Sequence, residues 1–340
     1  MTGAGTLSAR QPHGWAWLLP AAALTLALAG LHLSTGARAT SLTAFLDALT
    51  AFDPANFDQR ILLSLRLPRL CAALLGGAAI GLAGLLLQSL LRNPLAEPHI
   101  LGFNAGASLA VVVATALPAA LQPVAFARPL VATLGGAAVF SAVFALSSAG
   151  RLGLTMAKLT FCGIALSALA SALVSAILIL DQETLETVRF WLVGDLAGAA
   201  WPEVEAALAP ALLAAVAAIV IAPRLDAMAL GDISATGLGV PVRRTRLAGL
   251  GAAALLCGAA VSTVGPIGFV GLIVPGLAIR LSGGRHLPAL TLSAVGGAAL
   301  LVAADLAART LVPSREIATG IMTALVGAPV FLAIVARRIK

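Results

Sequence analysis

The chain has 340 residues, of which 60% are hydrophobic and only 10% are charged, and its mean hydropathy is +1.03. Soluble domains carry about 25% charged residues, so this composition excludes an ordinary water-soluble protein and indicates a surface that faces lipid. The formal net charge of +7 would suit nucleic-acid binding if it were clustered. The Lys and Arg residues instead lie in short segments between long uncharged stretches, as in the loops of a membrane protein.

The uncharged stretches indicate about ten membrane-spanning helices, because roughly 20 apolar residues cross a hydrocarbon layer of about 30 Å. They are continuous runs of Ala, Leu, Val and Gly, which favours helices over the alternating strands of a β-barrel. The longest, 247–279, is interrupted near Gly265 and Pro266, so we expect one full and one short helix there. In chain order, the expected helices are 14–33, 61–91, 100–117, 129–150, 159–180, 204–222, 247–264, 269–281, 287–308 and 316–335.

Charge in the connecting segments predicts the orientation of the chain. With the N-terminus inside the cell, most Lys and Arg residues fall in inner loops and most acidic residues fall on the outer side, which is the usual bias of helical membrane proteins. Both termini are therefore expected in the cytoplasm. The predicted organisation is a cytoplasmic tail over 1–13, a single transmembrane domain over 14–336 and a basic cytoplasmic tail over 337–340.

The first apolar run admits a second interpretation. Arg10, the apolar residues that follow it and the Thr35–Ala39 segment together also form the pattern of a cleaved signal peptide. The run from Trp15 to Leu33 is long for the apolar part of a signal peptide. A retained first helix is therefore favoured.

Three connecting segments have distinctive compositions. Residues 34–59 form an outer loop that carries most of the early acidic residues. Residues 92–99 (RNPLAEPH) form a tight inner turn, because two prolines and an asparagine do not continue a helix. Residues 181–202 are too polar to span the membrane, so we expect a short surface helix on the outer side.

Residues 223–246 form the one long inner loop. Asp226 and Asp232 are expected to cap two short helices in it, because Asp is a common N-cap residue. Gly237, Gly239 and Pro241 are expected to end the second of these helices.

No constellation in the sequence indicates catalysis or metal binding. The four histidines lie near expected helix ends or in loops, without an HExxH spacing or an evident partner carboxylate, and each of the three cysteines is alone in an apolar stretch. We therefore predict no catalytic residue, no metal ligand and no cofactor held by this chain. The residues considered are His13, His32, His99, His286, Cys71, Cys162 and Cys257.

The sequence also gives no sign of an energy source of its own. It contains no GxxxxGK[ST] phosphate-binding loop, and its expected spans are nearly free of the ionisable residues that ion-driven carriers use. The exception is Asp305, which is followed one helical turn later by Arg309, and we interpret these two as an ordinary ion pair within one helix. A separate ATPase that docks at an inner loop is therefore favoured, with a secondary carrier as a remote alternative.

Several motifs between residues 60 and 335 resemble a known family. They are RLPR (66–69), GLAGLLLQ (81–88), RNPLAEPHILGFNAGASLA (92–110), RFWLVGDLAGAAW (189–201), LDAMALGDISATGLGV (225–240), VGPIGFVGLIVP (264–275), ADLAART (304–310) and GIMTALVGAPVF (320–331). In this order they resemble the FecCD-type permeases, the membrane subunits of binding-protein-dependent ABC importers for ferric siderophores, haem and cobalamin. The chain departs from many members after Pro275, where a histidine is replaced by Gly276.

The resemblance implies a type II ABC importer permease fold in the bacterial inner (cytoplasmic) membrane, without enzymatic activity of its own. It implies three protein partners: a second permease subunit, identical or related; an ABC ATPase dimer that binds ATP and Mg; and a periplasmic substrate-binding protein. The chain would also contact the lipid bilayer, and it would bind no nucleic acid. Substrate would move from the periplasm to the cytoplasm. The RFW motif at 189–191 and the overall pattern favour a ferric siderophore, with haem and cobalamin as alternatives.

The resemblance also assigns roles to three groups of residues. Arginines at the outer ends of two helices would receive carboxylates of the binding protein, although anchoring to lipid headgroups is an alternative. Two inner turns would form a cytoplasmic gate. The long inner loop would couple the permease to the ATPase, although an ordinary connector is the alternative. The docking residues are Arg66, Arg69 and Arg309; the gate residues are Asn93, Leu95, Thr155 and Met156; and the coupling residues are Ala227, Leu230, Gly231, Asp232, Ala235, Gly237, Leu238 and Gly239.

Overall fold

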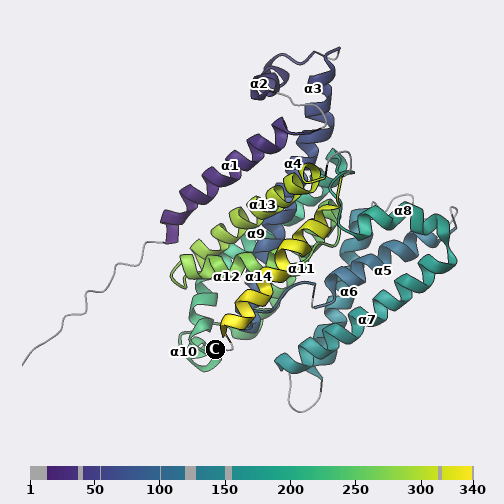
Figure 1. Cartoon of the computed structure of the whole chain (residues 1–340). Coiled ribbons are helices and arrows are strands. Elements are labelled where there is room, and N and C mark those ends of the chain that lie inside the picture. The colour runs from purple at the N-terminus through teal and green to yellow at the C-terminus, as the bar shows by residue number, and fades with distance from the viewer. Residues whose placement is uncertain are drawn as a thin grey trace, which may run out of the picture.

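The computed structural model describes residues 14–36, 41–53, 55–99, 101–118, 128–149, 155–312 and 316–338, and these form helices without a strand (Figure 1). The predicted all-α membrane fold is confirmed. Within the described residues, seven helices are long and apolar enough to cross a membrane. Three shorter apolar helices, over 103–116, 270–281 and 319–333, make the total consistent with the prediction of about ten. The predicted tail 1–13 and residues 339 and 340 lie outside the described residues, and the predicted domain limits stay a prediction.

The helix bounds follow the predicted spans closely. The first half contains a 3-10 turn at Gly14–Trp17, α1 (Leu18–Ser34), α2 (Leu42–Thr50), α3 (Phe57–Ile61), a π-helical turn at Leu62–Arg66, α4 (Leu67–Leu91), α5 (Phe103–Ala116) and α6 (Arg128–Ser148). The second half contains α7 (Met156–Leu180), α8 (Gln182–Leu192), α9 (Trp201–Ala229), α10 (Asp232–Gly237), α11 (Val242–Val264), α12 (Val270–Leu281), α13 (His286–Thr310) and α14 (Thr319–Arg338).

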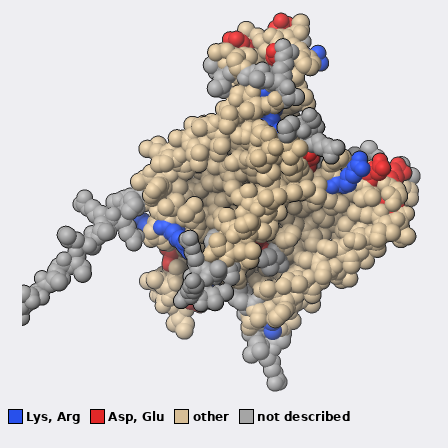
Figure 2. All heavy atoms as spheres, viewed as in Figure 1, with Lys and Arg blue, Asp and Glu red and all other residues tan. Residues whose placement is uncertain are grey.

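The two ends of the molecule carry different short elements. In Figure 1, α2, α3 and α8 lie at one end, and α10 lies at the other end together with the end of α14. We name these the outer end and the inner end, following the predicted orientation. Most of the surface between the charged groups of the two ends is uncharged in Figure 2, as expected for the part that faces lipid.

The central helix is α4, which is buried along most of its length and contacts α9, α11, α12 and α13. It continues a helix that begins at Phe57, and the join is a π-helical turn that ends at Arg66. Pro68 follows two residues later. Because proline has no N–H and its ring clashes with the preceding turn, the wider π-turn accommodates it without ending the helix.

Glycines allow the central helices to approach one another closely. A Cβ atom added at Gly81 of α4 would lie 2.2 Å from the carbonyl oxygen of Ser293 in α13, and one added at Gly84 would lie 2.1 Å from that of Gly271 in α12. Lipid is as apolar as leucine, so packing of small residues, rather than exclusion of water, associates helices in a membrane. The contact of α4 with α13 therefore depends on having no side chain at Gly81, and its contact with α12 on having none at Gly84.

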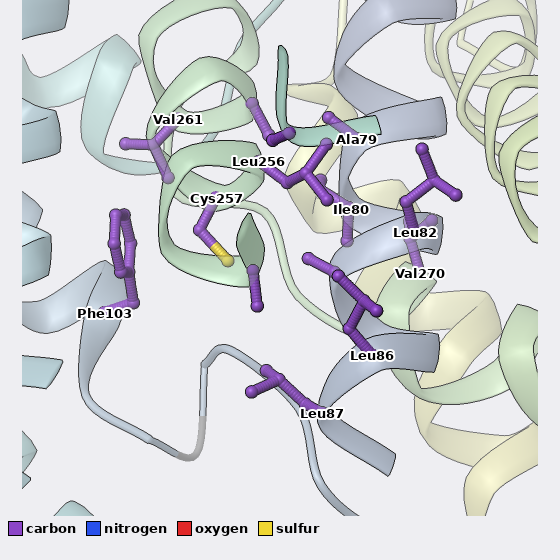
Figure 3. Close-up of a cluster of buried hydrophobic side chains, with 14 of the residues drawn as sticks. Ala79, Ile80, Leu82, Leu86, Leu87, Phe103, Leu256, Cys257, Val261 and Val270 are labelled. Carbon is purple, nitrogen blue, oxygen red and sulfur yellow. The ribbon is translucent and has the colours of Figure 1, made fainter. Parts of the chain in front are cut away.

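The space on the other side of α4 is filled by α11. Figure 3 shows Ile80, Leu86 and Leu87 of α4 with Leu256 and Cys257 of α11. Leu86 and Leu87 are completely buried, and Leu256 is 1% exposed. By contrast, α7 presents exposed leucine, isoleucine and phenylalanine side chains along its length, so it is a peripheral helix.

The prediction for the long inner loop is partly wrong. The loop was expected to begin at 223, but α9 continues through Pro223 to Ala229, because Leu225 and Met228 in its last turns are buried in the core. Asp226 therefore lies inside α9 and caps no helix of its own loop; its carboxylate instead accepts the backbone N–H of His286, the first residue of α13, at 2.8 Å. Asp232 lies in the first turn of α10 without capping it, and the N-cap is Gly231.

Candidate functional site

A group of charged and polar side chains is buried at the outer end, and Asp305 of α13 is its centre. Asp305 is completely buried, and its carboxylate accepts hydrogen bonds from the Nε (3.0 Å) and Nη2 (2.9 Å) atoms of Arg69. It is also bonded to Nε2 of His32 (2.8 Å) and to Oγ1 of Thr319 (2.7 Å). These contacts join α1, α4, α13 and α14. We name the group the outer polar cluster; it consists of His32, Arg66, Arg69, Asp305, Arg309, Glu316 and Thr319.

The expected ion pair of Asp305 and Arg309 within one helix is present, but it is only part of the arrangement. Arg309 does lie 3.5 Å from the carboxylate through its Nε atom, but the main partner is Arg69 of α4. The expectation that no histidine has a carboxylate partner is wrong, because His32 contacts Asp305 and His286 contacts Asp226 at 2.7 Å. Packing of separate helices creates these pairs, so nearness in the sequence does not reveal them.

The three predicted docking arginines all belong to this cluster and all have partners within the chain. Arg66 donates from Nη1 to the carbonyl oxygen of Leu33 (2.6 Å), and Arg309 donates from Nη2 to that of His32 (3.2 Å). Both carbonyls lie in the last turn of α1, where positive charge stabilises a helix. Arg69 uses its remaining terminal nitrogen, Nη1, to contact Glu316 at 2.9 Å.

The inner end contains the predicted gate residues in two separate turns. Asn93 follows α4, and its side-chain oxygen accepts a hydrogen bond from the N–H of Leu95 (3.0 Å), whose side chain is 39% exposed. Thr155 is the N-cap of α7 and accepts from the N–H of Lys158. Met156 is the first residue of α7, and its side chain lies outside the described part of the structure. The gate assignment stays a prediction.

The inner turn is held to the connector between α11 and α12 by side chains that the sequence analysis did not single out. Glu97 is 4% exposed, and its carboxylate accepts the N–H of Phe269, which has a left-handed φ of 69°. Gln88 donates to the carbonyls of Gly271 and Leu272 at 3.2 Å each. The signal available in the sequence was one acidic residue inside a proline-rich turn between two apolar helices.

We expect Glu97→Gln to remove a pH dependence of stability. Burial raises the pKa of Glu97 from its ordinary value of 4.5 to about 7, so in that range the folded chain holds a proton that the unfolded chain has released. The stabilisation is thus complete below pH 4.5 and is lost as the pH rises through about 7, by about 3 kcal/mol in total. The amide oxygen of the variant still accepts the Phe269 N–H.

The measurement is the midpoint of thermal unfolding in detergent at several pH values between about 5 and about 8. Glu186→Gln is the control, because Glu186 lies on α8 and is exposed. A wild-type curve that falls with rising pH, with a flatter curve for Glu97→Gln alone, is expected. Parallel curves for wild type and Glu97→Gln would contradict the prediction.

The short helix α10 projects its apolar side chains outward at the inner end. Ile233 is 91% exposed, and Leu230 and Leu238 are 68% and 66% exposed, whereas Ala235 is completely buried and holds the helix to the protein. Gly231 and Gly239 flank the helix with left-handed φ values of 112° and 81°, which favour glycine. Two of the predicted coupling residues, Leu230 and Leu238, thus form a small apolar projection together with Ile233.

Comparison with known proteins agrees with the motifs. A model of the FecCD transport family matches residues 24–337. The ferric enterobactin transport system permease protein FepD of Escherichia coli (strain K12) is 38% identical, over 95% of this chain and 96% of that protein. The vitamin B12 import system permease protein BtuC of Vibrio parahaemolyticus is 42% identical, over 81% of this chain and 82% of that protein.

A solved structure agrees with the fold as well. It is an inward-facing conformation of a metal-chelate type ABC transporter, with a TM-score of 0.79 and 29% identity, and the match covers 95% of this chain and 99% of that one. The family match begins within α1 and ends in the last turn of α14, and it includes the outer polar cluster, the inner turn and α10. The chain therefore belongs to the FecCD transport family and is a multi-pass membrane permease of the ABC-importer type.

Proposed function

We propose that this permease moves a ferric siderophore from the periplasm to the cytoplasm across the bacterial inner membrane, using ATP hydrolysed by a separate subunit. The observation that carries the proposal is family membership over residues 24–337 together with 38% identity to an enterobactin permease. Similarity to a vitamin B12 permease keeps cobalamin as an alternative substrate, and the family resemblance keeps haem.

The proposed partner at the inner end is a dimer of ABC ATPases, which would bind ATP and Mg. The exposed apolar side chains of α10 support this, since Ile233 is 91% exposed and α10 lies at the inner end of the molecule (Figure 1). An apolar projection into water is unfavourable unless a partner covers it. A second permease subunit, identical or related, would complete the membrane part of the transporter.

The proposed partner at the outer end is a periplasmic binding protein whose carboxylates contact Arg66, Arg69 and Arg309. Support comes from Glu316, which occupies the Nη1 atom of Arg69 and has a side chain that is 53% exposed. Asp305, which binds the Nε and Nη2 atoms of Arg69, is completely buried. An incoming carboxylate would therefore replace Glu316 and leave Asp305 in place.

The proposal is tested by transport into proteoliposomes that contain the permease, its ATPase and its binding protein. With ferric enterobactin, haem and cobalamin offered separately, we expect ATP-dependent uptake of the ferric siderophore to exceed that of the other two several-fold. The control is an ATPase variant that binds but does not hydrolyse ATP, with which uptake should stop.

Each contrary result has a distinct meaning in this assay. Preferential uptake of haem or cobalamin would contradict the siderophore assignment and leave the importer class intact. Uptake that continues without the ATPase and follows a proton gradient would contradict the ABC mechanism. It would instead favour a secondary carrier, for which the buried pair of His32 and Asp305 would be the natural proton site.

A further inference from the structure

Two arginines of the inner end, from different parts of the chain, contact the carboxylate of Asp232, the first residue of α10. Arg92, which directly follows α4, donates from Nη2 to Oδ1 of Asp232 at 2.6 Å and also to the carbonyl oxygen of Met228 at the end of α9. Arg246 of α11 contacts the same carboxylate at 3.2 Å. One arginine thus connects the end of α4 to α9 and α10.

Both partners of the Arg92–Asp232 pair are adjacent in the sequence to residues with proposed roles. Asp232 precedes Ile233, the side chain of α10 that is 91% exposed. Arg92 precedes Asn93, the first predicted gate residue. A single ion pair therefore lies between the surface proposed to contact the ATPase and the turn proposed to form the gate.

We propose that the Arg92–Asp232 ion pair transmits movement of α10 to the inner turn. This inference rests on the proposed function, because it needs an ATPase that moves α10 and a gate in the turn. Arg92 acts here as a positioning residue, which moves other groups and does not contact the substrate.

The local geometry suits this role. Arg92 is the C-cap of α4 and has a left-handed φ of 49°, a conformation that is strained for a residue with a side chain. The helix before it is buried and fixed by its packing. A force on the Arg92 side chain is therefore expected to move the inner turn (92–99) and not α4. This turn begins with Arg92 itself, the strained residue.

Contacts beyond Arg92 continue the connection. The Asn93 side chain fixes the N–H of Leu95, and Glu97 in the same turn holds the N–H of Phe269 at the start of α12. Displacement of the turn would therefore reach both Leu95 and α12. A continuous set of contacts is necessary for such transmission but does not by itself prove it, so energetic coupling must be measured.

The pair is suited to mutation because it is half exposed, with side-chain exposures of 43% for Arg92 and 45% for Asp232. Exposed ion pairs contribute little to stability. Loss of the pair should therefore leave folding and membrane insertion intact. A defect should appear in the amount of substrate transported per ATP hydrolysed.

The experiment compares variants of the reconstituted complex by transport and ATP hydrolysis. We expect Arg92→Gln to lower the transport-to-hydrolysis ratio several-fold, and the charge-reversed double variant Arg92→Asp/Asp232→Arg to recover part of it. We also expect Leu95→Cys to react with a maleimide at a nucleotide-dependent rate, and Arg92→Gln to reduce that dependence. Arg280→Gln is the control, because Arg280 is an exposed arginine at the end of α12.

The outcomes separate this inference from the proposed function on which it rests. Gly237→Trp tests the coupling surface alone, since a Cβ atom there meets nothing within 4 Å in the chain. If Gly237→Trp uncouples and Arg92→Gln behaves as wild type, the ion-pair proposal is overturned and the coupling surface stands. Equal uncoupling by Arg246→Gln and Arg92→Gln would also overturn it. Normal coupling in both Gly237→Trp and Arg92→Gln would overturn the coupling surface itself.

Discussion

Asp305→Asn is expected to destabilise the folded permease by about 3–5 kcal/mol. The carboxylate is completely buried and bonded to Arg69, His32 and Thr319. Its neutralisation leaves the buried guanidinium of Arg69 without its main counter-ion, and the attachment of α1 to α13 loses its central contact. The measurement is equilibrium unfolding of the purified protein in mixed micelles.

The matched control is Glu316→Gln, which removes the other carboxylate on the same arginine. The Glu316 side chain is 53% exposed, and water can replace it, so the expected change is at most about 1 kcal/mol. Equal effects for the two variants would show that burial does not determine the contribution of each carboxylate. A loss below about 1 kcal/mol for Asp305→Asn would contradict the assignment of Asp305 as the centre of the cluster.

Gly81→Ala is expected to destabilise the protein by about 3 kcal/mol or more. This loss equals or exceeds the largest losses that are typical when a side chain is enlarged in a packed core. The added Cβ atom would lie 2.2 Å from the backbone oxygen of Ser293. Backbone atoms cannot turn aside as the end of a flexible side chain can, so α4 and α13 must separate. Because α4 is the central helix, its other contacts are disturbed as well.

Gly251→Ala is the control for this prediction, and it should have the opposite sign. Gly251 lies in α11 and is exposed, and an added Cβ atom meets nothing within 4 Å. Alanine is favoured over glycine in a helix by about 0.5–1 kcal/mol, so a small stabilisation is expected. Thermal unfolding in detergent compares the two variants, and a similar change for both would contradict the packing argument.

The docking assignment shows how a motif and a structure contribute differently to one site. The motifs RLPR and ADLAART placed Arg66, Arg69 and Arg309 at outer helix ends. The structure adds that Arg66 and Arg69 are 7% and 8% exposed and are engaged by α1 and Asp305. Any role in docking therefore has to be compatible with a role in holding the helices together.

Membrane-spanning segments could be predicted because the signal is local. A span needs about 20 consecutive apolar residues, and charged residues mark its ends, so the composition of a short window is sufficient. The predicted split of 247–279 is found as α11 and α12, and the predicted surface helix in 181–202 is found as α8. Helix ends were harder to predict. The helix expected to end at 222 continues to Ala229, because buried Leu225 and Met228 stabilise its last turns.

The contacts between helices could not be predicted in the same way, because they join residues that are far apart in the chain and carry no mutual signal. Asp305 is four residues from Arg309 but 236 from its main partner Arg69 and 273 from His32. Arg92 and Asp232 are separated by 140 positions. The sequence by itself thus determined two things: local composition showed that the chain spans a membrane, and the motifs indicated its family. The packing of helices decided which charged residues are buried and which partners neutralise them, because only close contact in a low-dielectric interior makes such pairs obligatory.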